Sequence, residues 1–268
     1  MFIKKISIIS FILMIFSTNI VFAQKVNKER NSELTVEADE SLEWFEKEKY
    51  YLAKGNVLLK KSGLILKANI VKANYVLENN ESILKKIIAK DKVILIKDKT
   101  KATGQYMTYD TKKKIALLSG PFQTLTSPSG YVESKKSIMF DDLKHEAEAV
   151  GKVKIILPNK TIIYADKVKA YFKTEDKSLN KAIAIGNVII ENKLKEKTSK
   201  ADLGIYNSSS ETVKLEGNVV IINQDSLIRG TKGITNMKTG VSNIIGDPKN
   251  KKRVKGVFAP IKKQNKGD

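Results

Sequence analysis

Residues Gly186–Gly217 read GNVIIENKLKEKTSKADLGIYNSSSETVKLEG, and this stretch defines a unit that recurs along the chain. A Gly-Asn-Val opening leads into a short run of β-branched residues and a polar turn. An Ala-Asp segment then begins a second run, which ends on an aromatic residue. Self-similarity at a period of 29 to 36 residues is typical of stacked repeats rather than of one irregular domain. Intact or degenerate copies of the opening stand at Gly55, Asp91, Gly120, Gly151, Gly186, Gly217 and Gly246.

Both runs of each unit predict β-strands. β-branched residues dominate the first run, and apolar and polar residues alternate most clearly in Gly151–Ile155. Turn-forming residues such as Ser62-Gly63 and Pro158-Asn159 separate the runs. We therefore expect an all-β chain of repeated short antiparallel strands, with the Gly-Asn-Val and Ala-Asp segments at strand starts. No convincing helix is predicted after residue 24.

Alternate positions along these strands predict one apolar face that runs through every unit. Ordering a unit of about 30 residues costs on the order of 30–60 kcal/mol of conformational entropy. The four or five inward side chains of one unit recover only about 1.5–3 kcal/mol each. The units are therefore expected to stack and to share one apolar interior. The predicted inward face comprises Val57, Leu59, Val71, Val93, Leu95, Met107, Ile138, Val153, Ile155, Val168, Val188, Ile190, Val219 and Ile221.

The N-terminus predicts export. Residues 1–5 carry two lysines, residues 6–22 are mostly apolar, and Val21-Phe22-Ala23 is a small-x-small cleavage site. We expect residues 1–23 to be a cleaved signal peptide, with an uncleaved membrane anchor as the alternative. Residues 24–33 are expected to be a flexible lead-in, residues 34–248 the folded part, and residues 249–268 a basic C-terminal tail.

The chain of 268 residues has a formal charge of +20, and removal of Lys4 and Lys5 with the signal peptide leaves 20 − 2 = +18. Such a charge favours anionic partners, namely anionic lipid or a phosphorylated glycolipid. We expect no nucleic-acid partner, because the chain is exported. Alternatively, the many lysines reflect genome composition. No cysteine is present, so the fold does not depend on disulfides.

The sequence offers no pattern typical of catalysis. His145 is the only histidine, and the chain lacks both a phosphate-binding Gly-rich loop with Lys-Ser/Thr and a Gly-x-Ser-x-Gly elbow. Asp39, Asp166 and Asp202 recur at equivalent positions of different units, so we interpret them as turn and strand-start residues. We expect a protein that is not an enzyme and that uses no metal and no cofactor.

The order of these motifs resembles the LptA/OstA family of lipopolysaccharide-transport proteins over roughly residues 34–258. The resemblance is carried by Gly55-Asn56-Val57, by residues 104–120, by the Ala-Asp segments and by the ending Gly246-Asp247-Pro248 with Arg253-Val254. It implies a periplasmic β-jellyroll shaped like an open V. The chain is longer than a compact family member by a repeat or so, and its Gly120 copy lacks the Gly-Asn-Val opening.

The resemblance implies a carrier that moves lipopolysaccharide from the inner to the outer membrane. It implies an LptC-like inner-membrane component and an LptD-like outer-membrane translocon as partners, together with end-to-end self-association. The fourteen residues of the inward face then become candidates for lining an acyl-chain groove. Two alternatives stay open: a membrane-anchored LptC-type component of the same pathway, and an exported structural β-repeat scaffold.

Overall fold

The computed structural model describes residues 34–79, 81–223 and 226–258, and its regular secondary structure there consists of β-strands. The predicted signal peptide, the lead-in and the last ten residues lie outside these ranges. The strands are β1 (Thr35–Glu37), β2 (Ser41–Phe45), β3 (Tyr50–Lys61), β4 (Leu64–Glu78), β5 (Glu81–Lys97), β6 (Thr100–Asp110), β7 (Ile115–Ser119), β8 (Gln123–Ser127), β9 (Gly130–Ser134), β10 (Ser137–Asp141), β11 (Glu146–Ile156), β12 (Thr161–Phe172), β13 (Leu179–Asn192), β14 (Lys197–Asn207), β15 (Thr212–Asn223), β16 (Ser226–Asn236), β17 (Ser242–Ile245) and β18 (Lys255–Phe258).

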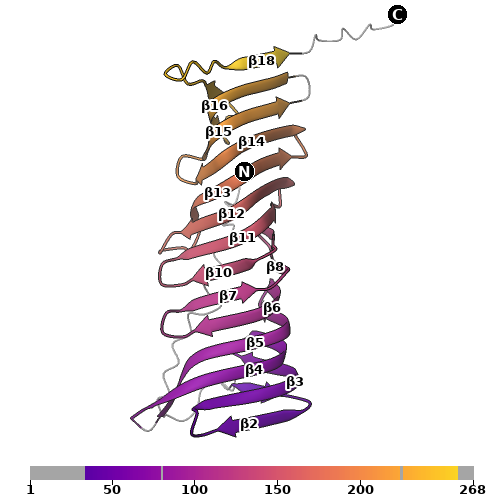
Figure 1. Ribbon diagram of the computed structural model, residues 1–268, viewed down its shortest axis with the longest axis vertical. Coiled ribbons are helices and arrows are strands. Elements are labelled where there is room, and N and C mark those ends of the chain that lie inside the picture. The colour runs from indigo at the N-terminus through magenta and orange to yellow at the C-terminus, as the bar shows by residue number, and fades with distance from the viewer. Residues whose placement is uncertain (1–33, 80, 224–225, 259–268) are drawn as a thin grey trace, which may run out of the picture.

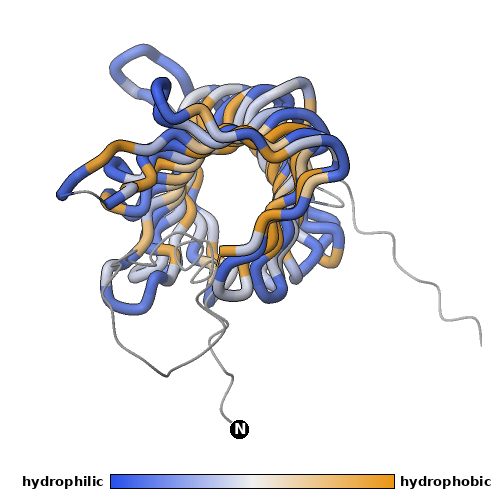
Figure 2. Tube along the Cα trace, turned by 90° about the horizontal axis from the view of Figure 1, so that it is seen from below, coloured by the Kyte–Doolittle hydropathy of each residue, from blue (hydrophilic) through white to orange (hydrophobic). Residues whose placement is uncertain are grey.

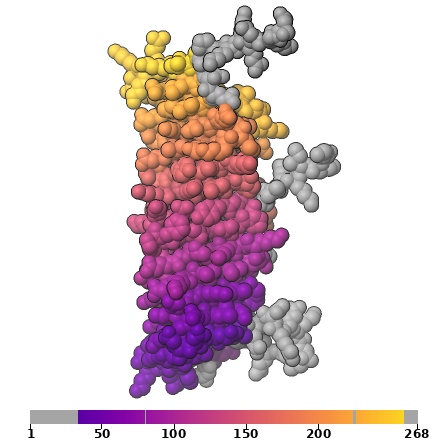
Figure 3. Space-filling model, turned by 90° about the vertical axis from the view of Figure 1, so that its right-hand side faces the viewer, coloured from indigo at the N-terminus to yellow at the C-terminus, as the bar shows by residue number. Residues whose placement is uncertain are grey.

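The strands stack in chain order into a column, each antiparallel to the next (Figure 1). Four pairs are the two halves of one curved strand, because both halves lie along the same neighbour: β1 with β2, β7 with β8, β9 with β10, and β17 with β18. The described residues therefore form 18 − 4 = 14 curved strands. At about 4.8 Å between neighbours, the column is about 60 Å long. Figure 3 shows it as a continuous stack from the N-terminal to the C-terminal strands.

Each Gly-Asn pair forms a bend in the middle of a strand. Gly186 and Asn187 have φ values of 75° and 48°, and the register of β13 with β14 shifts between Ile185 and Val188. The same pattern of two positive φ values and a register shift occurs at Gly55, Asp91, Gly151 and Gly217. The expectation that this opening starts a strand is therefore wrong. The repeat unit is two long strands, and the strand that carries the Gly-Asn opening bends there, because two successive left-handed residues turn the chain without ending its pairing.

The segments Ala165-Asp166 and Ala201-Asp202 lie inside β12 and β14, opposite these bends, so their predicted position at strand starts is wrong as well. Ala38-Asp39 lies between β1 and β2. Asn187 Nδ2 donates to Asp166 Oδ2 over 2.8 Å, and Asn218 makes the same bond to Asp202. Asn56 repeats the arrangement with Asp39 at the N-terminal end of the column. Each recurring aspartate thus fixes the bend of the neighbouring strand, which gives it a structural role.

Hairpin turns alternate between the two ends of the curved strands. The first turn set comprises residues 62–63, 98–99, 128–129, 157–160 and 193–196. The second turn set comprises residues 46–49, 111–114, 142–145, 173–178, 208–211 and 237–241. Viewed along the column, the strands between the two sets curve around a central axis, with apolar and polar residues alternating along them (Figure 2).

The inner face of this curve carries one continuous apolar interior. Its N-terminal part is a large cluster around Leu66, and two smaller clusters follow toward the C-terminus around Val188 and Val219. Ile138 packs against both of the first two clusters, and Ile190 packs against both of the last two. Stacked units therefore share their core, as expected for repeats that are too small to fold alone.

The last curved strand is divided by a loop. β17 pairs with the Lys232–Thr235 part of β16, and β18 pairs with the Ser226–Arg229 part. The sheet therefore continues to Phe258, and the predicted boundary between residues 248 and 249 falls too early. In the described ranges, no helix has the length and apolar character that a membrane span requires.

Candidate functional site

All fourteen residues of the predicted inward face lie on the inner face of the column. Eleven of them are between 0% and 8% exposed, including Val57, Val93 and Val219 at 1% or less. Ile138, Ile155 and Ile190 are partly buried and pack against the same clusters. The structure thus brings the predicted residues together along one interior, where they pack on one another. That they line an acyl-chain groove stays a prediction.

The inner face also contains small and aromatic residues that the sequence-based prediction missed. Phe140 and Phe172 lie in the largest cluster, with ring centroids 6.4 Å apart. The small residues are buried alanines beside the strand bends, and two of them, Ala165 and Ala201, belong to Ala-Asp segments. The Ala-Asp signature could have identified them, since its aspartate faces outward and its alanine inward. The buried alanines are Ala53, Ala68, Ala89, Ala102, Ala149, Ala165 and Ala201.

The interior has two chemically different rims. We call the inward residues next to the first turn set the polar rim, and those next to the second turn set the aromatic rim. The polar rim consists of Lys61, Lys97, Thr100, Ser127, Thr161, Asn192, Lys197 and Asn223. The aromatic rim includes Tyr51, Tyr75, Tyr109, Phe140, Phe172 and Tyr206.

Burial perturbs ionisable groups on both rims. It raises the pKa of Tyr109 to about 12, with Asp142 and Asp110 adding to the effect, and it raises the pKa of Tyr206. Burial also lowers the pKa of Lys97 and Lys197. Both directions have one cause, because desolvation disfavours the charged form of either group. The rims are therefore partly shielded from water.

The two rims meet at the C-terminal end of the column. Lys197 begins β14 at the polar rim, and its Nζ donates to Ser242 Oγ over 3.1 Å. Ser242 begins β17 next to the second turn set and lies 2.9 Å from the hydroxyl of Thr235. These inward side chains come from opposite ends of the curved strands. Between β14 and β17, the hydrogen bond from Lys197 to Ser242 therefore connects the two rims and closes the cross-section of the column.

An aromatic cluster occupies the N-terminal end of the inner face. Trp44 Nε1 donates to the hydroxyl of Tyr75 over 2.8 Å, and the ring of Tyr51 stacks on both, with centroids 6.1 Å from Trp44 and 5.0 Å from Tyr75. Trp44 is 61% exposed, so this end presents an apolar, aromatic surface to the outside. A concavity of about 500 Å³ is lined by Tyr50, Lys72 and Tyr75 among others. Lys72 Nζ lies 3.6 Å from the ring centroid of Tyr50.

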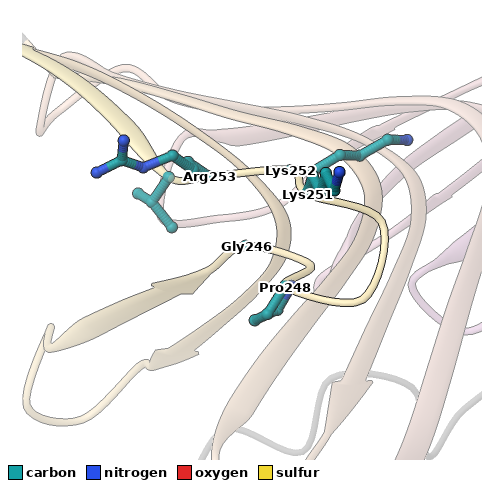
Figure 4. A pocket seen from close by; sticks show the side chains of 6 residues that line it. Gly246, Pro248, Lys251, Lys252 and Arg253 are labelled. Atoms are coloured by element: carbon teal, nitrogen blue, oxygen red, sulfur yellow. The ribbon is translucent and has the colours of Figure 1, made fainter.

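A second concavity, of about 520 Å³, lies beside the loop that divides the last curved strand. Gly246, Pro248, Lys251, Lys252 and Arg253 line it, together with Val254. The long cationic side chains of Lys252 and Arg253 point in opposite directions (Figure 4). Their charged groups do not converge on one point.

The interior contains two polar groups without a hydrogen-bond partner in the described part of the chain. The side-chain amide of Gln123 and the hydroxyl of Thr100 are both buried at 1% exposure or less.

His145 lies in a turn, with its ring 3.3 Å from Lys177 Nζ. No group of three or more metal-ligating acidic, histidine or cysteine side chains occurs among the residues that the structure describes.

The chain is similar to the crystal structure of LptH, the LptA-homologous periplasmic component of the conserved lipopolysaccharide transport device from Pseudomonas aeruginosa. The identity is 11%, the alignment covers 86% of this chain and 98% of LptH, and the TM-score is 0.22, which is too low to carry an argument. A comparison with curated proteins gave no match.

The sequence profile of one family matches the chain twice, and its description reads LptA/(LptD N-terminal domain) LPS transport protein. The matches cover residues 35–136 and 131–241, which together are more than half of the 268 residues. This confirms the resemblance inferred from the Gly-Asn-Val and Ala-Asp segments, and the observed antiparallel all-β architecture confirms the predicted fold class. The chain belongs to the LptA/LptD N-terminal-domain family of lipopolysaccharide transport proteins.

Proposed function

We propose that the protein is a non-enzymatic periplasmic carrier of lipopolysaccharide, which holds the acyl chains in its apolar interior. The continuous apolar inner face supports this, because it runs through all three clusters of the column. Sheltering a chain of twelve carbons from water requires roughly 10 kcal/mol at about 0.8 kcal/mol per methylene. An interior lined by Val, Leu, Ile and Ala supplies an environment of that kind.

Two family matches in one stack support a bridging role. The matched segments meet at residues 131–136, where β9 pairs with β8 and β11 in an unbroken ladder. One chain therefore carries two consecutive matches to the family in one column. At the two ends, the described residues leave one side of β2 and of β18 unpaired, and such strand edges accept further strands. We propose end-to-end self-association there, with an LptC-like partner at one membrane and an LptD-like partner at the other.

Site-specific photocrosslinking tests the carrier function. A photoreactive residue at inward Met107 or Val188 is expected to form adducts with lipopolysaccharide in cells. The neighbouring outward positions Thr108 and Ile189 are the matched controls and are expected to give few adducts. Equal labelling of inward and outward positions, or none at inward ones, would contradict the proposal.

A structural β-repeat scaffold is the second candidate, and the tight packing of the inner face favours it. Eleven of the fourteen predicted residues are at most 8% exposed. A scaffold with a closed core would not bind an environment-sensitive apolar dye, whereas a carrier would bind it and release it when lipopolysaccharide is added. Dye titration therefore separates the two candidates.

A further inference from the structure

The hydrogen bond that closes the cross-section places a lysine over the end of the apolar interior. Lys197 shares its inward orientation with Ala201, which is 6% exposed and belongs to the C-terminal cluster. Ile190 and Ile244 pack against that cluster. The ammonium group of Lys197 therefore lies at the edge of the C-terminal apolar cluster, where it donates to the hydroxyl of Ser242.

The charge of this lysine is not balanced nearby. No ion pair among the described residues involves Lys197, although six others occur on the column. Burial lowers its pKa, and the neighbouring positive charge of Lys195 lowers it further. Both influences disfavour the charged form of Lys197. A bound anion would therefore make a favourable Coulomb interaction with this ammonium, which has no such partner in the part of the protein that the structure describes.

We infer that Lys197, Ser242 and Thr235 form a subsite for the phosphate monoester of an amphiphile whose alkyl chain occupies the neighbouring apolar interior. The inference rests on the proposed carrier function and names the headgroup chemistry of that same site. A phosphate monoester carries about −1.5 to −2 charges and three acceptor oxygens. It can accept from the ammonium of Lys197 and from the two hydroxyls, which lie 2.9 Å apart at an exposed position within reach of the lysine.

The same strand offers a matched control. Lys200 is three residues along β14, faces outward and is exposed. It carries the same charge on the same strand, but it lies on the outer face between Ile189 and Val220, away from the interior. A non-specific attraction between this basic protein and any anion would involve both lysines alike.

The test uses the full chain and measures the displacement of a fluorescent fatty acid by decyl phosphate, by decanol and by inorganic phosphate. The wild-type protein is expected to bind decyl phosphate about tenfold more tightly than decanol, the size expected of one charge-assisted hydrogen bond. Lys197→Met is expected to remove this preference and to leave the affinity for decanol unchanged. Lys197→Arg should restore most of it, and Lys200→Met should behave as wild type.

The outcomes separate this inference from the carrier function. If Lys197→Met keeps the preference for decyl phosphate, or if Lys200→Met loses it equally, the subsite is wrong while the carrier function stands. If inorganic phosphate binds as tightly as decyl phosphate, the site takes a free anion and the amphiphile inference is wrong. If wild type binds neither decyl compound, the carrier function fails as well. Circular-dichroism melting of each variant shows that it is folded, and Ser242→Ala, expected to weaken only decyl phosphate, gives an independent second variant.

Discussion

At the scale of single residues, the glycine of each Gly-Asn pair has two constraints. Gly186 has a φ of +75°, and a Cβ atom there would overlap the carboxylate of Asp166 on the neighbouring strand. We expect Gly186→Ala to lower the free energy of unfolding by roughly 3 kcal/mol, because left-handed strain and a steric overlap add. Urea denaturation followed by circular dichroism measures the loss.

Gly63 is the matched control for that prediction. Its φ is +77°, almost the same, but nothing lies within 4 Å of a Cβ atom there. Gly63→Ala should therefore cost only the left-handed strain, about 1–2 kcal/mol. Equal losses at Gly63 and Gly186 would show that the contact with Asp166 is unimportant and that conformation alone selects glycine.

At the scale of elements, an outward ion-pair cluster joins β11 to β12. Glu148 lies 2.8 Å from Lys167 Nζ and 3.4 Å from Lys169 Nζ. Burial raises the pKa of Glu148, but the hydrogen bonds and charges of the two lysines outweigh it, so the pKa lies below the ordinary 4.5. A lowered pKa in the folded state means that the stabilisation is present above the unfolded pKa and is lost as pH falls through the folded pKa.

We expect Glu148→Gln to destabilise the protein by about 0.5–1 kcal/mol at neutral pH, because the pair is partly exposed. The difference from wild type should shrink as pH falls below about 4.5 and through the lowered pKa of the folded state, where Glu148 becomes as neutral as the glutamine. Chemical denaturation at pH 7 and near pH 3 measures it. A constant difference between Glu148→Gln and wild type at the two pH values would refute the linkage.

At the scale of the whole molecule, each curved strand pairs only with its sequence neighbours, so stability is expected to be local along the column. Val219 and Val93 follow equivalent bends and are both 1% exposed. Val219→Ala should lose about 2 kcal/mol from two buried methyl groups. Hydrogen exchange should accelerate in β14–β17 and stay unchanged in β3–β6.

The reciprocal variant completes that experiment. Val93→Ala should accelerate exchange in β3–β6 and leave β14–β17 protected, because the two sites share no strand. Uniform acceleration along the column by either variant would mean that the fourteen curved strands unfold as one cooperative unit. The continuous interior would then couple the ends more strongly than nearest-neighbour pairing does.

Sequence alone determined the all-β class, the repeat period, the family and the inward set from Val57 to Ile221. Those properties follow from local signals: β-branched alternation, glycine spacing and turn residues. It misplaced the strand boundaries, because a Gly-Asn pair with two positive φ values looks the same in sequence whether it ends a strand or bends one. The neighbouring strand decides between the two, because its aspartate accepts a hydrogen bond from the asparagine of the pair, as Asp166 does from Asn187.

The tertiary structure alone decided what lies across the interior. Lys197 and Ser242 are 45 residues apart, and no periodicity relates them. They meet because β14 and the two strands that follow it, β15 and β16, curve around the axis and bring opposite strand ends together. The separation of a polar from an aromatic rim has the same origin, since a side chain belongs to a rim only once the register of its hairpin is fixed. The register and the curvature of the strands depend on many strand pairings together, so a single stretch of sequence does not encode them.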